Sequence, residues 1–132
     1  MTFPRVVLLV SAAAFALFGA WAFVSPASQV EMVEVGVPTA TARADTRAQY
    51  GGFTLGMGLY LFVCFVRTGW TAAGLAASAI CLSGFVAARA VAVIADGPVA
   101  PTIYYLMLME GTAAVLSFAG WRVVARTYPS TG

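Results

Sequence analysis

The 132-residue sequence contains no histidine and no lysine, and only 9% of its residues are charged. Without histidine, the chain lacks the commonest general base and the commonest metal ligand. Soluble domains carry about 25% charged residues, so the scarcity of charge argues against a water-soluble globule. The net charge of +2 comes from scattered arginines, which excludes the dense basic surface of a nucleic-acid-binding protein. No nucleic-acid partner is therefore expected.

Cysteine is also scarce. Cys64 and Cys81 lie inside apolar runs and form neither a Cys-x-x-Cys motif nor a zinc-ligand spacing. We interpret both as buried thiols that act as small apolar side chains. The sequence therefore predicts no metal and no cofactor.

What the sequence has in excess is apolar residues, which make up 61% of it. They fall into four runs, at residues 6–24, 50–66, 70–95 and 103–124. A helix needs about 20 apolar residues to cross about 30 Å of hydrocarbon, and each run is near that length. We therefore predict an all-α membrane protein, a single domain over residues 1–132 whose four transmembrane helices form a bundle in the lipid bilayer.

The first run has a second interpretation, which is a cleaved signal peptide. However, residues 6–24 are longer than the usual apolar stretch of about 7–15 residues in such peptides. The segment Phe23-Val24-Ser25-Pro26 is also a poor cleavage site. We expect a retained helix.

The connections between the runs differ in length. Arg67-Thr68-Gly69 predicts a tight turn and residues 96–101 predict a short loop, so consecutive helices there should be antiparallel neighbours. The long connection over residues 25–49 begins with Ser25-Pro26, which is typical of a helix N-cap followed by proline at the first helical position. We predict a short interfacial helix from there to about Glu34, ended by the glycine and proline that follow.

The distribution of arginine gives the orientation. An even number of spans puts both chain ends on one side, and four arginines belong to that side: Arg5, Arg67, Arg122 and Arg126. The opposite side holds Arg43 and Arg47 together with four carboxylates. Because cytoplasmic loops favour Lys and Arg, we place both termini in the cytoplasm.

Arg89 and Glu110 lie well inside the apolar runs, where ionisable groups are costly unless they face the bundle interior or a wet cavity. Arg89 lies seven residues before Asp96, and Glu110 lies seven residues after Ile103. At 1.5 Å per residue, each lies about 10 Å below the outer end of its helix. On antiparallel neighbours the two side chains can meet at one level, and we expect a bidentate ion pair.

Five polar residues are expected near this outer end: Arg47, Tyr50, Arg89, Asp96 and Glu110. Two alternatives stay open for them. They line a polar pocket for a ligand, a proton or a lipid headgroup, or they form a buried network of ion pairs and hydrogen bonds that fixes helix register.

The second run is rich in glycine near its start, where Gly51 and Gly52 are followed by Gly56 and Gly58. Gly52 and Gly56 form a Gly-x-x-x-Gly pair, a pattern that lets another helix backbone come close. The first run carries a stripe of small residues of the same kind: Ala12, Ala16 and Gly19. Packing within the chain and formation of a homo-oligomer are both compatible with these patterns.

Several of these residues together resemble the motifs of a known family. Asp45-Thr46-Arg47-Ala48-Gln49-Tyr50-Gly51-Gly52, followed by Gly56-Met57-Gly58, is similar to the signature of a bacterial family of small four-helix membrane proteins known as domain of unknown function 4345. Arg89 with Asp96-Gly97 is similar to its second motif, and Glu110 to its third. The resemblance covers nearly the whole chain. It implies four transmembrane helices in a bacterial inner membrane, and it implies no activity.

The chain also resembles, more loosely, the DoxX-like group of small four-helix proteins, some of which are linked to redox or quinone metabolism. A redox centre in this chain has no support from its residues, because the sequence contains no histidine and no paired cysteine motif.

Three functions are compatible with these features. The sequence favours a non-enzymatic accessory subunit or binding component, acting as a homo-oligomer or within a larger membrane complex, because the chain has little mass outside the bilayer. The alternative is a small-molecule or lipid binder, or a transport component, that uses the outer polar pocket. A membrane enzyme with Glu110 or Asp96 as acid or base is less favoured, since no nucleophile, metal cluster or phosphate loop accompanies them.

Overall fold

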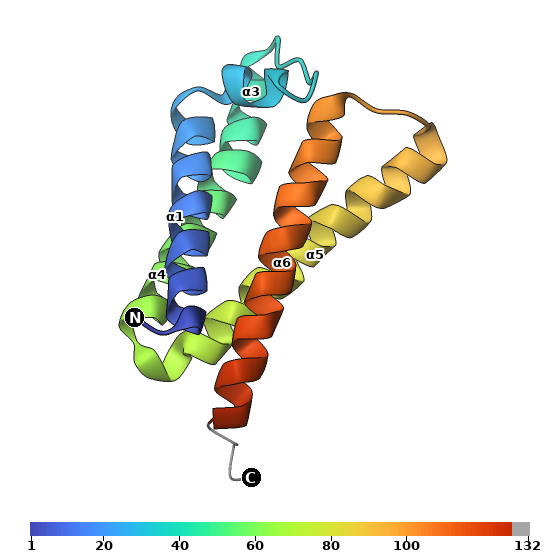
Figure 1. Cartoon of the computed structure of the whole chain (residues 1–132). Helices are drawn as coiled ribbons and strands as arrows, with labels where there is room; N and C mark the ends of the chain where they lie inside the picture. The colour runs from blue at the N-terminus through green and yellow to red at the C-terminus, as the bar shows by residue number, and fades with distance from the viewer. Residues whose placement is uncertain (128–132) are drawn as a thin grey trace.

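The computed structural model describes residues 1–127, which form helices joined by short connections. The elements are α1 (Phe3–Val24), α2 (Pro26–Glu31), α3 (Ala40–Thr46), the π-helix η1 (Arg47–Phe53), α4 (Thr54–Val66), the 3-10 turn η2 (Thr68–Trp70), α5 (Thr71–Asp96) and α6 (Pro101–Thr127). α3, η1 and α4 follow one another without interruption, so they act as one long helix (Figure 1).

Four stretches are long and apolar enough to cross a membrane: Phe3–Val24, Ala40–Val66, Thr68–Asp96 and Pro101–Thr127. The prediction of an all-α fold with four candidate transmembrane helices is therefore confirmed. α1 starts and α6 ends at the same end of the molecule, which we call the inner end (Figure 1). α2, α3 and the loop between α5 and α6 lie at the opposite, outer end. The side of a membrane that each end faces stays a prediction.

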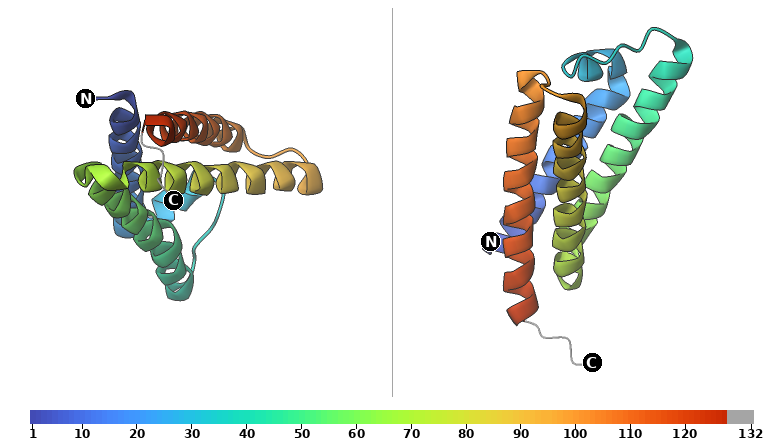
Figure 2. Two further views of the ribbon diagram at one scale, coloured as in Figure 1. Left: turned by 90° about the horizontal axis from the view of Figure 1, so that it is seen from below. Right: turned by 90° about the vertical axis from the view of Figure 1, so that its right-hand side faces the viewer.

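The four long helices form two antiparallel pairs, α1 with α4 and α5 with α6. The pairs pack on each other near the inner end and diverge toward the outer end (Figures 1 and 2). The turn between α4 and α5 makes them antiparallel and brings them into contact, as predicted, but the main partner of α4 is α1. A tight turn fixes the direction of the next helix and leaves open which neighbour it packs on most.

The second long helix begins ten residues before the predicted start at Tyr50. Thr39 is its N-cap, and the Thr39 hydroxyl accepts a hydrogen bond from the Ala42 nitrogen at 3.1 Å. The first two turns carry Arg43 and Asp45, so they are absent from the apolar run although nothing in them breaks a helix. An apolar run therefore predicts only the part of a helix that fits in hydrocarbon. It does not reveal the polar turns by which the same helix extends beyond that part.

The short helix after α1 is present, with Ser25 as N-cap and Pro26 as its first residue. It ends at Glu31, three residues before the predicted end. Glu34 has a φ of +62°, a left-handed conformation that cannot continue a helix.

The packed core lies in the half of the molecule near the inner end. Leu8, Leu61 and Leu75 are fully buried there, on α1, α4 and α5. Beyond Leu82 on α5, and before Ala114 on α6, no residue is buried. The outer halves of α5 and α6 therefore lie outside the packed core.

Close packing of α1 on η1 and α4 depends on two glycines of the predicted set, Gly51 and Gly58. A Cβ atom on Gly58 would lie 2.6 Å from the Ala16 nitrogen, and one on Gly51 would lie 2.9 Å from the Phe23 Cα. By contrast, a Cβ on Gly56 would have no neighbour within 4 Å, and Gly52 is exposed. Gly51 and Gly58 therefore face α1, whereas Gly52 and Gly56 face away from it and take no part in this contact.

The small stripe of α1 meets this surface as expected. Gly58 lies against Ala12 and Ala16, and Gly19 lies against the backbone of Leu55 and Gly51. Small residues on both helices thus let the two backbones approach, which is how helices associate when lipid removes the hydrophobic driving force.

Gly58→Ala should destabilise the fold, because its new methyl group meets backbone atoms of Ala16 that cannot move alone. We expect a loss of about 1–3 kcal/mol in the free energy of unfolding, measured by reversible denaturation in detergent micelles. Gly56→Ala is the matched control, since it adds a methyl group to the same helix where space is open. Equal stability of the two variants would contradict the contact between α1 and α4.

Candidate functional site

Arg89 on α5 and Glu110 on α6 form a bidentate contact. Arg89 Nε donates to Glu110 Oε2 at 3.1 Å, and Arg89 Nη2 donates to Glu110 Oε1 at 3.0 Å. The two side chains therefore meet in the geometry expected from their matching depths. Among residues 1–127 this is the only ion pair.

The faces of the two helices explain why these side chains meet. Arg89 follows Ser78 by three turns on the same stripe of α5, and Glu110 precedes Ser117 by two turns on the same stripe of α6. The hydroxyls of Ser78 and Ser117 lie 3.1 Å apart, and both residues are fully buried. The stripe that faces the core near the inner end thus continues outward to the ion pair.

The pair lies in the outer halves of α5 and α6, where the core has ended. The side chains of Arg89 and Glu110 are 24% and 17% exposed. The guanidinium has five N–H donors, of which the pair uses two, and the other three make no hydrogen bond within the described residues. In a bilayer such a group needs polar surroundings, because ionisable side chains are costly next to lipid tails.

Arg47 is expected in the outer polar cluster, but it contacts the end of α1. Its Nε donates to the carbonyl oxygen of Phe23 at 3.1 Å, in the last turn of α1. The last four carbonyls of a helix have no partner within the helix, and a cation is favourable near them. Gly51, four residues later, lies against the backbone of the same Phe23. Arg47 and Gly51 therefore form a clamp on the end of α1.

Arg47 and Gly51 both belong to the π-helix η1, which the sequence does not predict. Its seven residues, Arg47–Phe53, contain Arg47, Tyr50, Gly51 and Gly52 of the motif. A π-turn is wider than an α-turn, is rare, and is frequent at functional sites. Here it places the Arg47 side chain and the backbone of Gly51 against the last turn of α1.

The five predicted residues do not gather into one polar pocket. η1 packs on α1, α2, α3 and α4. Arg89 and Glu110 lie on α5 and α6, the helix pair that diverges from α1 and α4. Tyr50 and Asp96 are exposed and make no side-chain hydrogen bond within residues 1–127. The expectation of a shared pocket is therefore not met, because the two helix pairs separate before the outer end.

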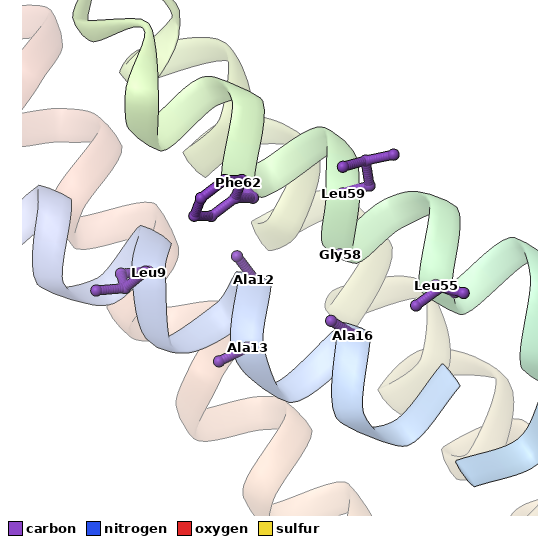
Figure 3. A pocket seen from close by; sticks show the side chains of 8 residues that line it. All are labelled: Leu9, Ala12, Ala13, Ala16, Leu55, Gly58, Leu59 and Phe62. Carbon is purple, nitrogen blue, oxygen red and sulfur yellow. The ribbon is translucent and has the colours of Figure 1, made fainter. Parts of the chain in front are cut away.

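Two apolar grooves lie on the helix pairs. One, of about 530 Å³, follows the contact of α1 with α4, where Figure 3 shows the side chains that line it: Leu9, Ala12, Ala13, Ala16, Leu55, Gly58, Leu59 and Phe62. The other, of about 430 Å³, lies between α5 and α6 beside Ala79 and Val115. None of the five predicted polar residues lines either groove.

Cys64 and Cys81 differ in how far they are buried. Cys64 is buried in the core as expected, whereas Cys81 is only half-buried. Within residues 1–127, no group of three Cys, Asp or Glu side chains is arranged to hold a metal ion.

Removing one partner of the ion pair should destabilise the protein more than removing both. Arg89→Ala leaves the Glu110 carboxylate without its cation, which should cost roughly 2–4 kcal/mol in the free energy of unfolding, given the partial exposure of the pair. The double change Arg89→Leu with Glu110→Leu should lose less, because no charge remains. Asp96→Asn is the control at an exposed carboxylate, and unfolding in detergent is the measurement. A single Arg89→Ala variant as stable as Asp96→Asn would contradict the pairing.

The comparisons with known proteins give a family. Residues 3–120 match the family described as domain of unknown function DUF4345, which is most of the chain. No curated protein and no solved structure matches the sequence. The match covers α1 through most of α6 and so includes the Arg47–Gly51 clamp, the ion pair and all the motif residues. The chain therefore belongs to the DUF4345 family.

Proposed function

We propose that this protein is a non-enzymatic binding component of the bacterial inner membrane, with both termini in the cytoplasm. On this proposal, the outer halves of α5 and α6 bind a transmembrane helix of a partner subunit. The observation that carries the proposal is the Arg89–Glu110 pair, which joins the two helices within residues 83–113, where no residue is buried.

The packing of α5 and α6 supports this proposal. Over residues 83–113, neither helix buries a side chain, and large apolar side chains such as Phe85 and Met109 are exposed. Lipid tails can cover apolar side chains at no cost, so these alone require no partner. The charged pair among them is different, because lipid tails offer its unused N–H donors no acceptor.

A polar side chain on a neighbouring helix would supply that acceptor. Hydrogen bonds between transmembrane helices contribute about 0.6–2 kcal/mol each, so the contact selects a partner with a polar group at the right depth. Most of the described residues belong to the four long helices, which also suits a membrane subunit. A homo-oligomer and a complex with a different protein both satisfy this chemistry.

Three observations argue against the other functions. The five polar residues that would line a shared pocket lie apart, and the grooves beside the helices are apolar. Arg47, which an enzyme or carrier would use to hold an anion, donates to the Phe23 carbonyl.

Site-specific photo-crosslinking in native membranes tests the proposed surface. A photoreactive residue at Phe85, on the same stripe of α5 as Arg89, should give a defined protein adduct. The matched control is Ile80, which is 74% exposed on another face of α5. The mass of the adduct distinguishes a second copy of the chain from another protein.

The adduct from Phe85 should be lost in the double variant Arg89→Leu with Glu110→Leu if that variant remains folded. Lipid adducts alone from both positions, or the same protein adduct from Ile80, would contradict a partner helix at this surface.

A further inference from the structure

The charges of the chain are sharply divided between its two ends. Four arginines lie at the inner end, and we call them the inner arginine rim: Arg5, Arg67, Arg122 and Arg126. All five acidic residues of the sequence lie elsewhere: Glu31, Glu34, Asp45 and Asp96 belong to the outer end, and Glu110 is paired with Arg89. The rim therefore has no acidic side chain that could neutralise it.

Four helix ends lie at the inner end: the starts of α1 and α5 and the ends of α4 and α6. Arg5, in the first turn of α1, donates from Nη2 to the Phe65 carbonyl oxygen at 3.1 Å, which ties α1 to the end of α4. A Cβ atom on Gly120 would lie 3.5 Å from the Pro4 Cα, so α6 passes close to the same turn of α1. Figure 2, left, shows the start of α1, the start of α5 and the last turns of α6 grouped in this view, and Figure 1 shows that α6 extends beyond the other two.

Aromatic rings hold three of the four guanidinium groups. The Arg5 guanidinium carbon lies 4.9 Å from the centre of the Phe65 ring, Arg67 lies 5.3 Å from Trp70, and Arg122 lies 5.5 Å from Phe118. A cation over a ring face leaves the N–H edges of the guanidinium free. Trp70 and Phe118 are themselves about half exposed, as is typical of the aromatic belt at the boundary between lipid tails and headgroups.

We propose that the inner arginine rim binds the phosphate groups of anionic phospholipids in the leaflet at the inner end. The planar guanidinium fork matches two phosphate oxygens. The rings hold the forks of Arg67 and Arg122 at this boundary, whereas Arg5 also donates to the Phe65 carbonyl. A phospholipid is favoured over a soluble anion because the arginines are spread over the start of α1, the turn between α4 and α5 and the end of α6. The proposal is independent of the partner surface on α5 and α6.

Each arginine near an anionic membrane surface contributes about 1 kcal/mol, which is roughly a fivefold change in binding. Losing Arg122 and Arg126 together should therefore weaken the preference for anionic lipid by more than tenfold. These two residues suit the test because they are exposed and make no hydrogen bond within residues 1–127, whereas Arg5 also holds the Phe65 carbonyl.

The experiment is native mass spectrometry of the full chain in mild detergent, with phosphatidylglycerol and phosphatidylcholine of equal chain length. The wild-type protein should retain phosphatidylglycerol preferentially, and in the variant Arg122→Gln with Arg126→Gln this preference should fall more than tenfold. Arg43→Gln, which removes an arginine from the outer end, is the matched control and should keep the wild-type preference. Thermal unfolding of each variant verifies that it is folded, and Arg126→Gln alone replaces the double variant if that one is not.

Three results would overturn the proposal. The first is equal retention of both lipids by the wild-type protein. The second is a loss of preference in Arg43→Gln as large as in the rim variant. The third is displacement of phosphatidylglycerol by an equal concentration of inorganic phosphate, which would identify a site for soluble anions.

Discussion

The contact between Arg89 and Glu110 is the constraint on which the arrangement of α5 and α6 depends. Both residues lie in apolar segments, where a lone charge would be far less favourable than a paired one. The pair therefore fixes the depth at which α5 and α6 face each other and holds their outer halves together after the core has ended. The buried hydroxyl contact of Ser78 with Ser117 sets the same register nearer the inner end. Together these two polar contacts leave little freedom for one helix to slide along the other.

The pairing of α1 with α4 is held by different means. Small residues, among them Ala16, Gly19 and Gly58, bring the two backbones together, and the Arg47–Gly51 clamp fixes the last turn of α1. One pair thus depends on close backbone contact and the other on a charge contact. The two pairs share the core near the inner end and separate beyond it. The ion pair therefore lies outside this shared core, where the proposed partner helix would cover it.

The sequence predicted the fold class and one contact of the site for clear physical reasons. Apolar runs reveal spanning helices because lipid requires them, and the depths of Arg89 and Glu110 follow from counting residues from the helix ends. The target of Arg47 could not be predicted in this way, because it is a backbone carbonyl that no side-chain pattern marks. The choice of Gly51 and Gly58 over Gly52 and Gly56 depends on which face of the helix meets α1. The unpredicted π-helix η1 helps to determine that face.

The most direct test of the account is an exchange of the two charges. In lipid nanodiscs, Arg89→Glu and Glu110→Arg should each lower the unfolding temperature, because two like charges would then face each other at the same depth. The combined exchange should recover most of the loss, since it restores one cation and one anion to the same contact. A combined variant no more stable than either single variant would show that the two residues do not act as a pair.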